Sequence, residues 1–155
     1  MDLEKIQAFF FQAMVEGWAT CDQKIMIAEM PGYKAIPFRD GKLSLLDNYC
    51  VNPNSPYSAG TTTIWHQDLP VWLMNYGGWY DKRAIAFLKR ALSQTYNAHQ
   101  FVGGRGPLVY TEGNLIYVNH VRLNDFRKFE GREEVLDADI GESLGFHQYW
   151  GMSLI

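Results

Sequence analysis

The sequence has little cysteine and no long apolar run, and each scarcity excludes a class of protein. Its two cysteines, Cys21 and Cys50, form neither a metal-binding spacing nor a disulfide framework, so a reducing, cytoplasmic environment is expected. Gln12 interrupts the apolar segment AFFFQAMV, and acidic residues precede it where a signal peptide would be basic. No segment approaches the roughly 18 unbroken apolar residues of a membrane helix, so no membrane association is expected.

Charge is also scarce, since charged residues make up 20% of the chain against an average of about a quarter, and the net charge is −3. A nucleic-acid-binding domain presents a basic face, so we expect no nucleic-acid partner. The 155 residues and a hydrophobic content of 47% indicate a single domain over residues 1–155 with its own core. Aromatic residues are plentiful, with five Trp, nine Tyr and nine Phe. Tyr and Trp suit the wall of a cleft as well as a core.

Two segments carry the three- and four-residue apolar spacing of helices that pack on a core. The first runs from a cap at Asp2 to Gly17, where a glycine can take the left-handed conformation that ends a helix. The second covers residues 84–96 behind a cap at Asp81. Its predicted inward face consists of Ala84, Phe87, Leu88, Ala91 and Leu92.

The remaining segments alternate short apolar runs with turn residues, which predicts hairpins. Asp40-Gly41, Glu112-Gly113 and Glu130-Gly131 are each predicted to separate two strands, with Gly41 at positive φ. The segment HQDL is predicted to separate TTTIW from PVWLMNY. Residues within LIYVNHVRL alternate between two unlike faces, which antiparallel sheets allow. The order helix, hairpins, helix, hairpins predicts an α+β fold, with a mostly antiparallel sheet and two packed helices.

The same order suggests a weak internal duplication, because each half starts with a helix and ends in a cluster of Tyr, Trp and Gly. Those clusters are NYGGWY and QYWGM. The one long polar segment, VNPNSPYSAG at residues 51–60, is predicted to be a loop, and loops of this length often carry function.

Five segments follow one another in the order FFFQAMVEGWAT, DNYCVNPNSPYSAG, PVWLMNYGG, FLKRAL and FEGREEVL. In this order the chain resembles a family of small bacterial domains of unknown function. PVWLMNYGG is similar to the family's Pro-Val-Trp-x-Met-Asn-Tyr-x-Gly, and DNY to its Asp-Ser-Tyr. Members of the family occur alone or behind an XRE-type helix-turn-helix, which this sequence lacks, so the resemblance implies no DNA-binding role here. It also implies no settled activity.

Motifs for phosphate binding and acid chemistry are weak. GGRG at residues 103–106 is followed by the strand-like PLVYT rather than by a helix, so a hinge before a strand is favoured over a phosphate loop. The acidic residues from Glu133 to Glu142 are interpreted as a solvated strand edge and loop. The sequence contains no nucleophile elbow, Walker loop or dinucleotide fingerprint.

The histidines are scattered without the spacing of metal ligands. A site assembled from His66, Asp68, His120 and His147 is the less favoured alternative to single surface histidines. A Cys–His pair at Cys50 is less favoured still, because the resembled family tends to have another residue there. We therefore expect no metal and no cofactor.

The segment PVWLMNYGGWYDKRAIAFLKRAL at residues 70–92 starts as an aromatic strand, is predicted to break at Gly77-Gly78 and ends as the second helix. Trp72 and Tyr76 share a face by strand periodicity, and a turn at the two glycines would bring Trp79 over the same face. Asn75 lies on the opposite face, where fixing that turn is favoured over contacting a ligand. Core packing is the alternative for each ring, but the cluster as a whole indicates an aromatic cleft.

Two functions remain open. The favoured one is non-catalytic binding or sensing of a small molecule or peptide, with Asp47, Tyr49, Trp72, Tyr76 and Trp79 as the ligand-binding residues. The alternative is a hydrolase or lyase that uses Asp47 and a histidine brought close by the fold. Docking through an aromatic surface, a homodimer included, is also compatible with the sequence. A buried carboxylate within hydrogen-bond reach of a histidine would favour catalysis, and a cleft without such a pair would favour binding.

Overall fold

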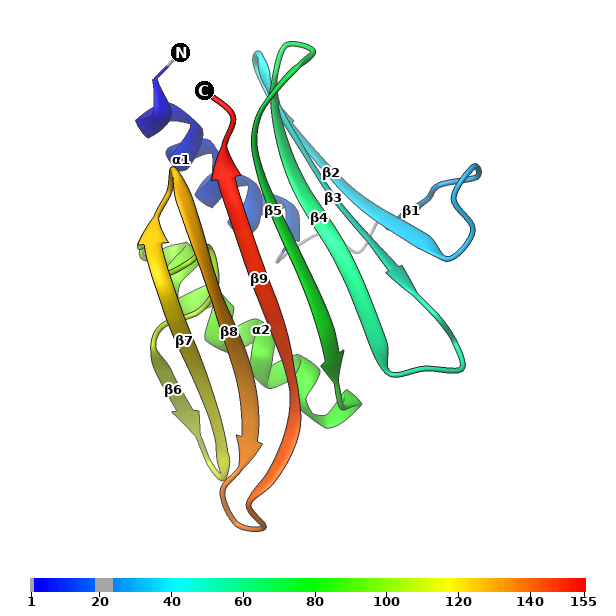
Figure 1. The fold of residues 1–155 in the computed structure, drawn as a ribbon, viewed down its shortest axis with the longest axis vertical. Helices are drawn as coiled ribbons and strands as arrows, with labels where there is room; N and C mark the ends of the chain where they lie inside the picture. Colours follow the sequence, from blue (N-terminus) through cyan, green and yellow to red (C-terminus); the bar gives the residue numbers. More distant parts are fainter. Residues whose placement is uncertain (1, 19–23) are drawn as a thin grey trace.

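The computed structural model describes residues 2–18 and 24–155. Figure 1 shows its elements, which in chain order are α1 (Leu3–Gln12), the π-helix η1 (Ala13–Trp18), β1 (Ile25–Met26), β2 (Tyr33–Asp40), β3 (Leu43–Val51), β4 (Tyr57–His66), β5 (Leu69–Tyr80), α2 (Lys82–Asn97), β6 (Val109–Glu112), β7 (Leu115–Asp125), β8 (Lys128–Asp137) and β9 (Glu142–Ser153).

The strands of the described residues form one nine-stranded antiparallel sheet in the order β1-β2-β3-β4-β5-β9-β8-β7-β6. Strands β2 to β5 are successive hairpins, and so are β6 to β9. The last strand of each run lies at the centre, where Trp72–Tyr80 of β5 pair with Gly145–Ser153 of β9. The α+β class and the mostly antiparallel sheet are therefore confirmed, with more strand than helix.

Both helices lie on one face of the sheet, behind it in Figure 1. The caps are those predicted, since the side chains of Asp2 and Asp81 accept backbone N–H groups of Glu4 and Arg83. The first helix does not end at Gly17, because η1 continues it to Trp18. The predicted inward face of α2 is confirmed, and all five of its residues are buried.

The core fills the space between the helices and the sheet. Phe10 of α1 packs on Trp72 of β5, with ring centroids 5.1 Å apart, and Trp72 in turn stacks on Phe126 and Phe129. These contacts tie the first helix to the strands of the second half of the chain. No helix in the described part of the chain is long and apolar enough to cross a membrane.

Three of the predicted reversals are confirmed. The β2–β3 turn has Gly41 at φ +56°, and the β6–β7 turn has Gly113 at φ +60°. The β4–β5 turn lies within HQDL, between His66 and Leu69. The predicted loop over residues 51–60 is shorter, because β3 extends to Val51 and β4 already begins at Tyr57.

Two predicted breaks at glycine are wrong. Strand β8 continues through Gly131, and the reversal before it lies between Asp125 and Lys128. Strand β5 likewise continues through Gly77-Gly78 to Tyr80. These glycines serve close approach instead of chain reversal. Any side chain at Gly131 would overlap the Tyr149 ring.

Gly131→Ala should destabilise the protein by about 1–3 kcal/mol, because its methyl group would overlap the Tyr149 ring and the His120 carbonyl oxygen. Denaturant unfolding measures the change. Gly77→Ala is the matched control on β5, two strands away in the same sheet, and there the methyl group would meet Ala59 Cβ at 3.3 Å. The control should lose less stability, and a Gly131→Ala midpoint equal to that of the wild type would contradict the close approach.

Candidate functional site

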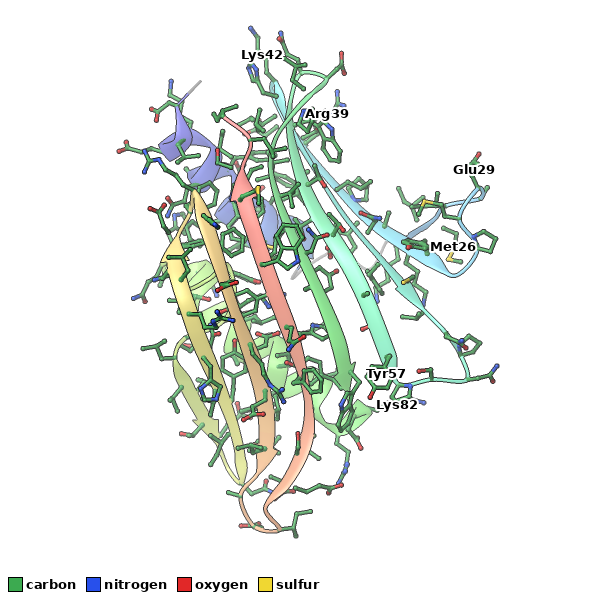
Figure 2. All side chains as sticks on the ribbon, viewed as in Figure 1. Met26, Glu29, Arg39, Lys42, Tyr57 and Lys82 are labelled. Carbon is green, nitrogen blue, oxygen red and sulfur yellow. The ribbon has the colours of Figure 1, made fainter. Side chains whose placement is uncertain are left out.

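A cavity of about 340 Å³ lies between α2, the end of the first helical segment and the sheet. The exposed residues Val51, Tyr57 and Ile85 form its rim, and Figure 2 labels Tyr57 where β4 begins. Its polar walls include Asp47 and Tyr49 of β3, Thr62 of β4, Tyr76 and Tyr80 of β5, His147 of β9, and Arg105 of the loop after α2. Its apolar walls include Met74, Leu88 and Leu92. We call this space the inner cavity.

Asp47 is a buried carboxylate on the cavity wall. Strand alternation turns it toward the helices, opposite Thr62 on β4. Its Oδ1 accepts hydrogen bonds from Tyr76 Oη at 2.8 Å and from Thr62 Oγ1 at 2.9 Å. Burial raises the pKa of the Asp47 carboxyl above its ordinary value, against these two hydrogen bonds, which lower it. The wall therefore offers an acid that holds its proton more readily than one in water.

A buried ion pair between Arg105 and Glu133 closes the inner end of the site. Arg105 donates from Nε to Glu133 Oε1 at 3.0 Å and also from Nη2, and Tyr117 Oη donates to Oε2 at 2.6 Å. Glu133 is 0% exposed. Burial raises the pKa of Glu133, but the charge and hydrogen bonds of Arg105, together with His147 and Tyr117, leave the pKa below its ordinary value. The carboxylate therefore stays ionised, and Arg105 lies 5.5 Å over the Tyr76 ring.

Glycine conformations bring Arg105 into this position. Gly103 and Gly104 have φ of +61° and +70°, and the segment after α2 turns back under the sheet. Thr95 Oγ1 donates to the Arg105 carbonyl oxygen at 2.6 Å, and Gly106 N–H donates to Tyr117 Oη at 3.0 Å. The GGRG segment is therefore not only a hinge before β6, because it also carries the buried guanidinium.

Two polar atoms at the cavity are buried without a partner among the described residues: Tyr80 Oη and His147 Nδ1. The two rings lie 4.8 Å apart edge to face, and His147 Nδ1 is 3.9 Å from Glu133 Oε1, too far for a hydrogen bond. Burial and the Arg105 charge lower the pKa of His147 to about 4. The imidazole is therefore neutral near pH 7 and can accept or donate one hydrogen bond at its free nitrogen.

The structure brings together three of the five predicted ligand-binding residues. Asp47, Tyr49 and Tyr76 all line the inner cavity. Trp72 does not, because its ring is 0% exposed in the core and its Nε1 donates to the Phe126 carbonyl oxygen at 3.0 Å. Trp79 does not either, since β5 runs straight through the two glycines and alternation places Trp79 on the far face. The expected grouping of Trp72, Tyr76 and Trp79 on one concave surface therefore does not hold.

Asn75 also has a different role from the predicted one. It lies on the sheet face away from the helices, and its Oδ1 accepts a hydrogen bond from Thr61 Oγ1 at 2.8 Å. It fixes no turn, because none exists there.

Four residues of the site were missed or misinterpreted from the sequence: Tyr80, Arg105, Glu133 and His147. Glu133 was assigned to a solvated acidic run, yet it is two residues from the buried Val135 on one strand. Strand alternation could have placed Glu133 on the inward face with Val135. No sequence signal pairs Glu133 with Arg105, because their contact joins β8 to a loop in another part of the chain.

The grouping of His66, Asp68, His120 and His147 does not form. His120 lies on the far face with its side chain 60% exposed, and no cluster in the described chain could hold a metal ion. Cys50 Sγ donates to the Ala59 carbonyl oxygen at 3.4 Å and faces away from the inner cavity by strand alternation. Cys21 lies outside the described residues.

The fold and the cavity define a small α+β domain with a polar site enclosed between one sheet and its helices. Residues 53–152 match the family model described as "Domain of unknown function (DUF5680)", and the chain belongs to this family. The matched range includes Tyr76, Tyr80, Arg105 and His147 but not Asp47. Comparisons with curated proteins and with solved structures found no match.

Acid should destabilise the native protein through His147. The unfolded imidazole has a pKa of about 6.5, whereas folded His147 has a pKa of about 4. Between these values only the unfolded state takes up the proton, so stability falls as the pH falls, by ~3 kcal/mol over the whole window. Urea unfolding at a series of pH values measures this dependence.

The comparison with variants isolates His147 from the carboxylates that titrate in the same range. His147→Gln should lose this part of the pH dependence, and His120→Gln, with its exposed side chain, should keep it. Identical pH profiles for the wild type and His147→Gln would contradict the buried neutral imidazole.

Proposed function

We propose that this protein binds or senses a small hydrogen-bonding molecule in the inner cavity, without catalysing a reaction. The observation that carries the proposal is the pair of unpartnered buried atoms, Tyr80 Oη and His147 Nδ1, on the cavity wall. A buried polar group without a partner costs about 1–3 kcal/mol, and most native proteins avoid this cost. A ligand that bonds to both atoms would remove it.

The size and the walls of the inner cavity restrict the class of ligand that it can bind. A volume of about 340 Å³ is near the lower end of small-molecule sites and favours a compact molecule over a peptide. Met74, Leu88 and Leu92 offer apolar contact, while Asp47, Tyr80 and His147 offer donors and acceptors. Because Arg105 is neutralised by Glu133, the floor favours an uncharged polar head such as an amide or a nitrogen heterocycle.

We also infer that the two halves arose by internal duplication and that only the first half kept an open site. Tyr76 and Tyr149 are cross-strand partners at the centre of the sheet. Each donates to a polar side chain two strands away, Asp47 in the first half and Asn119 in the second. The Asn119 amide donates to two carbonyl oxygens of the segment 102–106, whereas Asp47 lines the inner cavity. A ligand would take the place that this segment fills in the second half.

A second candidate function is hydrolase or lyase chemistry that uses Asp47 and His147. The observation that favours it is the opposite direction of their shifts: burial raises the pKa of Asp47, and burial lowers the pKa of His147. A carboxyl that holds its proton more readily and an imidazole that is neutral near pH 7 are groups that general acid–base catalysis can use. Turnover of a bound compound by the wild type, lost in both Asp47→Asn and His147→Gln, would replace the binding proposal with this one.

Tyr80→Phe should weaken ligand binding by about tenfold without lowering stability. The hydroxyl lies near the Glu133 carboxylate but makes no hydrogen bond of ordinary geometry to a described residue, so its removal leaves the ligand-free protein as stable as the wild type or more so. Thermal-shift screening with uncharged amides and mono- and bicyclic nitrogen heterocycles finds the binders, and calorimetry gives their affinities.

Tyr110→Phe is the matched control, since Tyr110 lies on edge strand β6 and does not line the inner cavity. It should bind like the wild type. The inner cavity is not a ligand site of this kind if no compound binds, or if Tyr80→Phe leaves the affinity of every bound compound unchanged.

A further inference from the structure

A second hollow lies on the far face of the sheet, on the side that the helices leave open. It is a groove of about 670 Å³ over β5, β9, β8 and β7. Its lining residues lie in the middle of those strands, and strand alternation turns Asn75, Gln148 and Trp150 among them toward the groove. We call it the outer groove. Figure 1 views the sheet from this side, with the helices behind it.

Strand register sets the arrangement of the outer groove. Asn75 pairs with Trp150, and Trp150 pairs with Glu130, so the indole lies between an amide and a carboxylate. In the next row Gly77 pairs with Gln148, and the missing side chain at Gly77 leaves space beside the indole. Trp150 is 48% exposed and makes no ring contact within the described chain. A half-exposed indole with free space at its side is a flat apolar platform.

The charged residues of the outer groove form ion pairs. Arg122 pairs with Glu130 at 3.2 Å, and Arg132 pairs with Glu134 at 3.3 Å while lying over the Phe146 ring. The formal charges of these two pairs cancel. A groove for an anionic polymer would keep basic side chains free, and a groove for a cationic one would keep acidic side chains free. The charge balance therefore favours an uncharged occupant.

The amides of the outer groove remain open for hydrogen bonds. Asn75 uses its Oδ1 for Thr61 and leaves Nδ2 free. The Gln148 amide and the Trp150 Nε1 make no hydrogen bond to any other described residue. Around the apolar platform the groove thus offers uncharged donors and acceptors, which suit a ligand with many hydroxyl groups.

We propose that the outer groove binds a neutral carbohydrate, with one sugar ring stacked on Trp150 and its hydroxyl groups bonded to Asn75 and Gln148. The C–H face of a sugar ring is apolar while its edge carries hydroxyl groups, which matches a platform bordered by amides. A proline-rich peptide fits less well, because grooves for such peptides are lined by several aromatic side chains. Here only Trp150 among the lining aromatics is exposed.

The test uses the full chain and four neutral probes: cellohexaose, xylohexaose, mannohexaose and fully N-acetylated chitohexaose. Titrations followed by NMR and by calorimetry should show binding of at least one probe, with shifts centred on Trp150 and Gln148. Trp150→Ala should lose affinity by at least about tenfold, and Trp150→Phe should keep part of it because a smaller platform remains. Denaturant unfolding confirms that each variant is folded.

Two controls separate this site from its neighbours. Trp79→Phe changes a tryptophan on the same face outside the outer groove, and Tyr80→Phe changes the inner cavity, so both should bind the sugar like the wild type. The proposal is overturned if none of the four probes binds, or if binding persists unchanged in Trp150→Ala. It is equally overturned if a proline-rich peptide binds in place of the sugars, or if Trp150→Ala dissociates a dimer, which would make this face a protein interface.

Discussion

The antiparallel pairing of β5 with β9 is the interaction on which the rest of the structure depends. It joins two runs of hairpins that would otherwise be separate small sheets with open edges. Because side chains alternate along each strand, this single pairing also distributes the functional residues between two faces. Tyr76, Tyr80 and His147 turn toward the helices, and Asn75, Gln148 and Trp150 turn away. The inner cavity and the outer groove are thus opposite sides of one strand pair.

The polar interior of the protein is organised by the Arg105–Glu133 ion pair. Burying two charges is expensive unless hydrogen bonds satisfy the remaining atoms, and Tyr117 supplies the second partner of the carboxylate. Removing either charge alone would leave the other buried and uncompensated. Burial and, after it, the positive charge of Arg105 disfavour protonation of His147, so this imidazole is neutral near pH 7. The ion pair therefore contributes to the chemical character of the site as well as to its shape.

Local sequence signals predicted the structure correctly where a short segment decides its own conformation. The caps at Asp2 and Asp81 need only a side-chain oxygen within reach of two or three backbone N–H groups. The turn at Gly41 needs only a residue that tolerates positive φ. The inward face of α2 follows from its apolar spacing. Strand alternation related Tyr76 to its own strand only, and Asp47 and Tyr49 were predicted beside it on the condition that their strand pairs nearby.

The errors arose where a distant part of the chain decides the role of a residue. Glycine is typical of turns, but Gly131 and Gly78 lie inside strands. A side chain at either position would overlap a neighbouring strand, at the Tyr149 ring or the Phe146 backbone. Trp72 was assigned to a cleft wall and is core, because Phe126 and Phe129 cover it from the other half of the chain. Glu133 was assigned to solvent and is buried, because Arg105 meets it there. The sequence by itself determined the periodicity within an uninterrupted helix or strand, and hence which of its side chains share a face. Tertiary packing alone decided which face is covered and by what, because burial is a property of contacts between segments far apart in the chain.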